Sequence, residues 1–132
     1  MRALDTNLLV RLLTNDDRRQ AAKVEAWLRT HATAQSPAYV DHVVLCELAW
    51  VLERSYGYAR EEVALALAAL VAHGQLKLES PALVREALAL HAQGPADFSD
   101  YLLAVRARAA GFSPVLTLDR KAAKTATHEL LR

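Results

Sequence analysis

The sequence predicts an α/β protein in which helices cover a central, mainly parallel sheet on both faces, giving a three-layer α/β/α arrangement. Short apolar segments alternate along the chain with longer segments whose apolar residues recur at helical spacing. This alternation favours parallel strands, because parallel neighbours need a crossover connection that a helix supplies. No linker, internal repeat or low-complexity segment interrupts the 132 residues, so we expect a single domain over residues 1–132.

The first half of the chain contains clear start and stop signals. An apolar triplet runs into Asp5, which predicts a short buried strand followed by a helix. Asp16 and Asp17 occupy positions suited to the N-terminus of a second helix, and Gly57 suits the C-terminus of a third. The expected elements are a strand at 2–5, helices at 7–13 and 17–32, a strand at 38–40 and a helix at 41–56.

Glycine and proline also delimit the second half. Gly74, Gly94-Pro95 and Gly111 each follow a segment of helical periodicity, and Pro81 suits the first turn of a helix. A buried strand ending in Asp119 comes late in the chain. The expected elements are helices at 60–73, 81–92 and 98–110, strands at 76–78 and 114–118, a helix at 120–125 and an edge strand at 129–131.

Composition restricts the class of protein. The chain has 16 Lys and Arg against 15 Asp and Glu, a net charge of +1, which does not exclude nucleic acid because a basic patch can coexist with an acidic pocket. The single cysteine, Cys46, cannot form an internal disulfide and indicates a reducing cytoplasm. The longest uncharged apolar run, 63–72, is half of the roughly 20 residues that a membrane span requires, so we expect no membrane contact.

Two acids end predicted strands. Asp5 and Asp119 each follow an apolar segment and precede a helix. The carboxyl ends of parallel strands open into the crevice where α/β sheets bind ligands, so both acids are candidates for a functional site. Either side chain could instead simply cap the helix that follows it.

A third acid, Glu47, lies within a predicted helix. At about 100° per residue, its nearest neighbours on the helical wheel are Val43, Val44, Trp50 and Val51. This predicts a carboxylate in the middle of an apolar face, which is costly unless it is paired or bound to a metal. The alternative to a functional role is an ion pair with Arg54, two turns later on the same line of the helix.

Asp97 and Asp100 lie three residues apart where a helix begins. Asp97 suits the N-cap, and Asp100 suits a first-turn position that the helix dipole stabilises. Asp100 is the better functional candidate, because Leu103 and Ala104 continue the predicted inward face beside it.

Considered together, these acids indicate a metal site. Neighbouring carboxylates cannot all ionise without a cation, and ligation by oxygen alone favours Mg²⁺ or Mn²⁺ over zinc. Such ions activate water and clamp phosphodiesters for in-line attack. The histidines show no ligand spacing, and the sequence contains neither a phosphate-binding glycine loop nor a nucleophile elbow.

The motifs Asp5-Thr6-Asn7, Glu47, 96–101 (ADFSDY) and 116–120 (LTLDR) resemble those of PIN-domain ribonucleases, in particular the VapC-type toxins of prokaryotic toxin–antitoxin pairs. The similarity extends over essentially the whole chain. It implies a PIN-like fold and an acidic pocket for Mg²⁺ or Mn²⁺. The matching residues are Asp5, Glu47, Asp100 and Asp119, with Asp97 as an auxiliary ligand or helix cap.

The resemblance also implies roles for neighbouring residues and partners. Thr6 and Asn7 would orient Asp5 or its water, and Tyr101 would narrow the pocket, because the family more usually has a small residue there. RNA would be the substrate, the protein would form a homodimer, and a cognate antitoxin would obstruct the site. Candidates for RNA backbone contact are Arg11, Arg106, Arg108, Arg120, Lys121 and Lys124.

Two other functions remain open from the sequence. The chain could be a catalytically silent RNA- or protein-binding module that keeps the pocket. It could also be an aspartyl-phosphate phosphotransferase with Asp5 as nucleophile. Such enzymes carry a second acid two residues later, where this chain has Asn7.

Overall fold

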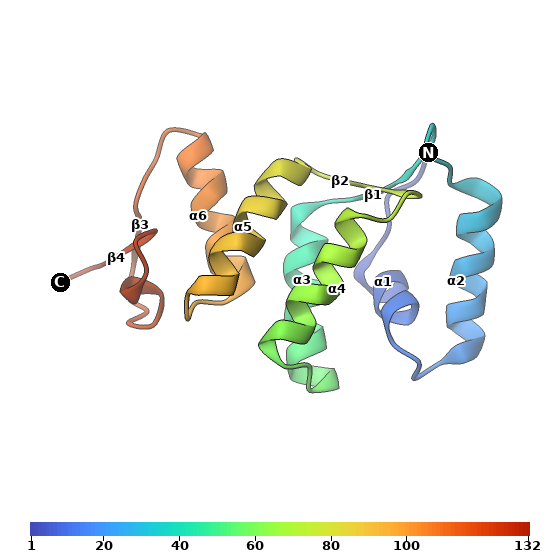
Figure 1. The fold of residues 1–132 in the computed structure, drawn as a ribbon, viewed down its shortest axis with the longest axis horizontal. Helices are drawn as coiled ribbons and strands as arrows, with labels where there is room; N and C mark the ends of the chain where they lie inside the picture. The colour runs from blue at the N-terminus through green and yellow to red at the C-terminus, as the bar shows by residue number, and fades with distance from the viewer. The chain divides into compact units, whose positions relative to one another are not determined.

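The structure is a computed structural model that describes all of residues 1–132. The chain divides into two compact units, Met1–Pro81 and Ala82–Arg132, and each is described by itself. All strand pairing is parallel. Helices predominate in both units (Figure 1). The predicted α/β class is therefore confirmed, and the elements are consistent with a three-layer α/β/α fold. The strands form two parallel pairs, one in each unit.

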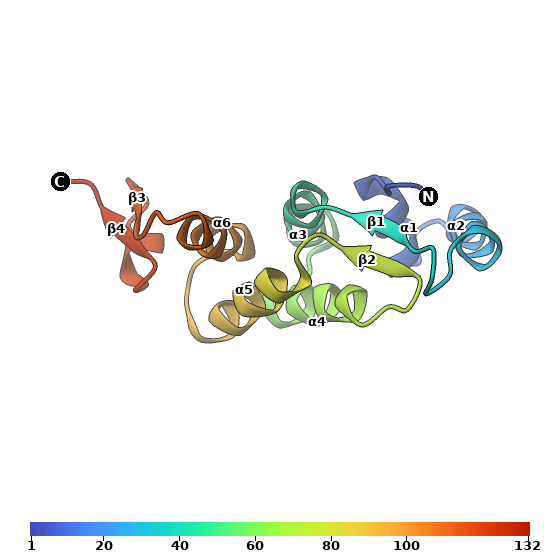
Figure 2. The same cartoon turned by 90° about the horizontal axis from the view of Figure 1, so that it is seen from above.

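The first unit contains four helices and one strand pair. In β1 and β2, which run side by side in Figure 2, Ala38 lies opposite Leu76 and Val40 opposite Leu78. The N-terminal segment adjoins β1, with Leu4 N–H donating to the carbonyl of Tyr39 at 2.8 Å. The elements are α1 (Thr6–Leu13), α2 (Arg18–His31), β1 (Ala38–Val40), α3 (His42–Tyr56), α4 (Arg60–Val71) and β2 (Leu76–Leu78).

The core of the first unit follows from the apolar patterns of these elements. One face of the strand pair is buried, whereas Tyr39 and Lys77 on the other face are exposed. Helices α3 and α4 pack side by side (Figures 1 and 2) and bury Leu45, Leu52 and Leu67 completely. Full burial of each such leucine contributes about 1.5–3 kcal/mol, and this apolar core fixes the N-terminal segment against β1.

Polar caps define the helix ends. Asp17 and Asp41 accept the N–H groups of Gln20 and Val44 at the starts of α2 and α3. Gly57 ends α3 with φ of 67°, a left-handed conformation that favours glycine. The predicted stop at Gly57 is confirmed, and α2 begins one residue later than predicted, with Asp17 rather than Asp16 as its N-cap.

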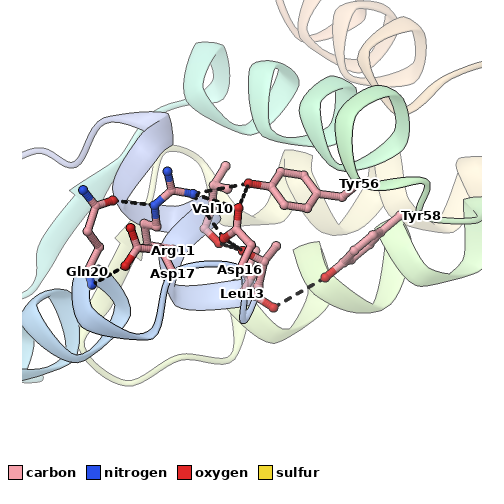
Figure 3. A network of polar contacts seen from close by, with 9 residues as sticks. Val10, Arg11, Leu13, Asp16, Asp17, Gln20, Tyr56 and Tyr58 are labelled. Atoms are coloured by element: carbon pink, nitrogen blue, oxygen red, sulfur yellow. Dashed lines mark hydrogen bonds and ion pairs between the residues drawn. The ribbon is translucent and has the colours of Figure 1, made fainter.

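A polar network holds the α1–α2 turn against the end of α3 (Figure 3). Asp16 accepts a 2.5 Å hydrogen bond from the Tyr56 hydroxyl and one of 2.8 Å from the Thr14 hydroxyl. Arg11 forms an ion pair with Asp16 at 3.2 Å and donates to Gln20. The hydroxyl of Tyr56 is the main reason that the pKa of Asp16 is lowered, and it also raises the pKa of Arg11.

We expect Tyr56→Phe to lower the free energy of unfolding in a pH-dependent way. The lowered pKa of Asp16 means that its carboxylate stabilises the fold above about pH 4, and that this contribution disappears as the pH falls through the folded-state pKa. The stability gap between wild type and Tyr56→Phe should therefore be present at pH 7 and narrow below about pH 4. Urea denaturation across this range measures the gap.

Tyr58→Phe is the matched control, because the Tyr58 hydroxyl donates to the carbonyl of Leu13 and touches no acid. Its stability gap should not change over the same pH range. A gap for Tyr56→Phe that is equally insensitive to pH would contradict the role given to Asp16.

The second unit is a helical hairpin followed by a small parallel strand pair. His91 of α5 contacts the rings of Phe98 and Tyr101 of α6 edge-on. Val115 lies opposite His128 in the strand pair. The elements are α5 (Pro81–Gln93, beginning at the last residue of the first unit), α6 (Phe98–Ala109), β3 (Val115–Thr117), the 3₁₀ helix η1 (Ala122–Lys124) and β4 (His128–Leu130).

Tyr101 lies inside this hairpin. Its side chain is 2 % exposed, and its hydroxyl is 3.4 Å from the N–H of Ala96. A Cβ added at Gly94 would lie 1.6 Å from that hydroxyl, so any larger residue there would force the Tyr101 ring to shift. The expectation that Tyr101 narrows an acidic pocket is wrong, because the ring fills the hairpin interior.

Two predicted elements differ from the structure. The expected strand at 2–5 is reduced to a single parallel bridge between Ala3 and Tyr39. The expected helix at 120–125 is only the short η1. The backbone is extended at Thr125, so the helix ends after one 3₁₀ turn. The other predicted helices and strands are confirmed, with ends that move by at most two residues.

Candidate active site

The first unit brings Asp5 and Glu47 to the same threonine. Asp5 is the N-cap of α1 and accepts the backbone N–H of Thr6 at 2.7 Å. The Thr6 hydroxyl donates to Glu47 Oε1 of α3 at 3.1 Å. Thr6 is buried, whereas both carboxylates are exposed. Thr6 thus contacts two acids that are 42 residues apart in the sequence, Asp5 through its backbone N–H and Glu47 through its hydroxyl.

The predicted surroundings of Glu47 are wrong. Glu47 is exposed, and its expected apolar neighbours Val43 and Trp50 are 65 % and 57 % exposed. The buried face of α3 is instead formed by Leu45, Leu48, Ala49 and Leu52. The helix is apolar on most sides, so its periodicity did not determine which side faces the core.

The proposed ion pair of Glu47 with Arg54 does not form. The Arg54 guanidinium stacks over the Trp50 ring, 5.2 Å from its centroid. The carboxylate of Glu47 is held by the Thr6 hydroxyl instead.

The second unit joins Asp97, Asp100 and Asp119 through short contacts at the start of α6 and the end of β3. Asp97 is the N-cap of α6, and its N–H donates to Asp100 Oδ2 at 3.1 Å. Lys121 Nζ forms an ion pair with Asp97 Oδ1 at 3.3 Å. The Lys121 N–H donates to Asp119 Oδ1 at 2.9 Å. The predicted N-cap position of Asp97 is confirmed, whereas the residue that precedes η1 as its N-cap is Lys121, so Asp119 is not the N-cap of a helix. Of the three acids, only Asp100 is partly buried.

The predicted RNA-contacting cations have different environments. Arg11 and Lys121 are already paired with Asp16 and Asp97. Arg108 forms an ion pair with Glu86. Arg106, Arg120 and Lys124 have exposed side chains. The three paired cations, by contrast, would have to exchange partners to bind phosphate.

The donor chemistry of the first unit fits a hard divalent cation. Mg²⁺ commonly binds through one or two carboxylates and keeps several waters. Asp5 and Glu47 each use one oxygen toward Thr6, which leaves the second oxygen of each carboxylate available. Within neither unit do three His, Cys, Asp or Glu side chains gather closely enough to hold a metal ion by themselves.

A pocket that the sequence analysis did not find lies at the end of α2. It has a volume of about 180 Å³, and its lining includes Arg2, Trp27, His31 and Ser36. The ring of Trp27 is half-buried and stacks on His31 one turn later, with centroids 5.1 Å apart. The aromatic pair at i and i+4 is the signal that could have indicated this surface.

Comparison with known proteins agrees with these features. No helix combines the length and apolarity needed to cross a membrane. A curated relative described as "VapC ribonuclease", from Aquifex aeolicus, is 24 % identical over 121 residues, covering 92 % of this chain and 89 % of the relative. The PIN domain family matches residues 2–127, a range that includes every candidate acid. The chain therefore belongs to the PIN domain family.

Proposed function

We propose that this protein is a Mg²⁺- or Mn²⁺-dependent endoribonuclease, the toxin of a toxin–antitoxin pair. The observation that carries the proposal is the Asp5–Thr6–Glu47 arrangement in a chain of the PIN domain family. The similarity to a VapC ribonuclease supports RNA as the substrate and an antitoxin as the partner.

We propose Asp5, Glu47, Asp100 and Asp119 as the catalytic carboxylates and metal ligands. In this role Thr6 holds Asp5 and Glu47 in position, and Asn7, exposed on the first turn of α1, faces solvent where it can bind a water. Asp97 acts as a cap for α6 and a partner for Lys121. These carboxylates would hold a divalent cation, which when bound would supply positive charge beside the scissile phosphate and acidify a water.

The remaining parts of the proposal follow from the family. We propose that residues 1–132 act as one domain, since the family match runs from residue 2 to residue 127 and through both units. The protein would work in the cytoplasm as a homodimer. Arg11, Arg106, Arg120 and Lys121 are the proposed contacts to the RNA backbone.

The direct test is incubation of the purified protein with a mixed RNA pool in Mg²⁺, in Mn²⁺ and in EDTA. Cleavage that requires the metal is the expected result. Calorimetric titration with Mn²⁺ accompanies it, because a narrowly selective ribonuclease can spare the pool and still bind metal. RNA binding without cleavage, together with no Mn²⁺ binding, would favour the catalytically silent module instead.

Thr6→Val should lower metal-dependent cleavage by about tenfold. Valine preserves the shape of threonine but removes the hydroxyl that donates to Glu47 Oε1, so the carboxylate loses its orientation. Thr6→Ser keeps a hydroxyl and should retain most of the rate. Rates and Mn²⁺ affinities of both variants distinguish positioning from a general loss of folding, and equal rates in Thr6→Val and wild type would exclude the positioning role.

A further inference from the structure

We propose that the pocket between the N-terminus and the end of α2 binds one nucleotide unit, with its base on the Trp27–His31 stack and its phosphate on Arg2. The proposal rests on the proposed function, because the nucleotide would then be part of the RNA substrate. The pocket lies wholly within the first unit and contains none of the candidate catalytic acids.

The size and surface of the pocket fit a planar ring. A cavity of about 150 Å³ in another protein accepts benzene, and this one has a volume of about 180 Å³. The rings of Trp27 and His31 are nearly parallel, with an interplanar angle of 18°. Aromatic faces of this kind stack bases of single-stranded RNA without requiring a particular sequence.

The charges of the pocket fit a phosphate. The lining contains the cation Arg2 and no acid. The Arg2 backbone is fixed, since its carbonyl accepts the N–H of Tyr39 at 2.8 Å, while its exposed guanidinium forms no ion pair. The carbonyl of Trp27 lies 3.2 Å from His31 Nδ1, which must donate to it, so His31 Nε2 is available to a ligand.

Helix α2 extends this surface away from the pocket. Arg19, Lys23, Trp27 and His31 recur every four residues, which places them on successive turns about 6 Å apart along the helix. Arg19 and Lys23 are exposed, and α2 as a whole carries four Lys or Arg against one acid. A strand whose base occupies the pocket would therefore find cations for its adjoining phosphates.

The test uses the full chain in EDTA, so that no cleavage occurs and the result does not depend on the proposed nuclease activity. Trp50→Phe leaves Trp27 as the single tryptophan. In this background we expect AMP to quench the fluorescence of Trp27 saturably, and inorganic phosphate to compete without quenching. A short fluorescent single-stranded RNA, measured by anisotropy, reports on the polymer form of the same ligand.

Variants assign the binding to the pocket. Arg2→Gln should weaken AMP and RNA binding about tenfold, the value of one charge-assisted hydrogen bond. Trp27→Ala should weaken RNA binding by a similar factor or more. If Trp27→Ala does not fold, His31→Ala replaces it as the test of the aromatic stack, because His31 is exposed and its loss should leave the fold intact.

Arg29→Gln is the matched control, because Arg29 is exposed on the same helix but does not line the pocket. It should change either affinity less than twofold. RNA binding without AMP binding would keep the proposal and identify the polymer as the ligand. Quenching by phosphate alone, an equal loss in Arg29→Gln, or no binding of either nucleotide form would overturn it, whatever the outcome of the cleavage assay.

Discussion

Asp5→Asn and Asp100→Asn should each reduce metal-dependent RNA cleavage by at least about a hundredfold without unfolding the protein. Both acids carry charge in the proposed site, and asparagine removes that charge. Asparagine also keeps a carbonyl oxygen, which can still accept the N–H of Thr6 in the first case and of Asp97 in the second. Alanine would instead lose a helix-capping acceptor and cost about 1 kcal/mol of stability.

The matched control is Asp41→Asn, because the Asp41 carboxylate also accepts a backbone N–H at a helix start, that of Val44 at 2.9 Å. It lies outside the proposed machinery and should retain full activity. Initial cleavage rates in Mn²⁺, with circular dichroism of each variant, provide the comparison. Retained cleavage in Asp100→Asn, or an equal loss in Asp41→Asn, would remove Asp100 from the proposed catalytic set.

Gly94→Ala should destabilise the protein by about 1–3 kcal/mol, the usual cost of overpacking a filled interior. The added Cβ would lie 1.6 Å from the Tyr101 hydroxyl oxygen and 2.8 Å from its Cζ. The ring cannot retreat easily, because it is 2 % exposed and bordered by the His91 ring. Urea denaturation of the variant and the wild type measures the effect.

A double-mutant cycle with Tyr101→Phe tests the cause. Phenylalanine removes the hydroxyl oxygen but keeps Cζ, so the double variant should recover part of the lost stability, more than the sum of the single effects predicts. Gly74→Ala is the control, since a Cβ there meets no atom within 4 Å. Additive losses in the cycle would show that Gly94 and Tyr101 do not clash in solution.

Many helix and strand boundaries could be predicted from the sequence, because they depend on short-range residue patterns. Helix α2 begins within one residue of the predicted start at Asp16 and Asp17, and Gly57 ends α3 in a left-handed conformation as predicted. Both signals were readable because each depends on a residue type and its immediate neighbours. Residues 2–5 were less predictable. A strand exists only by pairing, and this segment forms one bridge, to Tyr39.

The candidate site also combines features that local sequence predicts with features that depend on tertiary contacts. The sequence alone determined the α/β class, the parallel pairing and the identity of the candidate acids, because periodicity, helix signals and residue chemistry are local properties. Only the tertiary structure decided that Thr6 links Asp5 to Glu47, that Tyr101 fills the helical hairpin and that Glu47 is exposed. These outcomes depend on which side of an apolar helix meets the core and which side chains meet across the chain, and no periodicity encodes such long-range contacts.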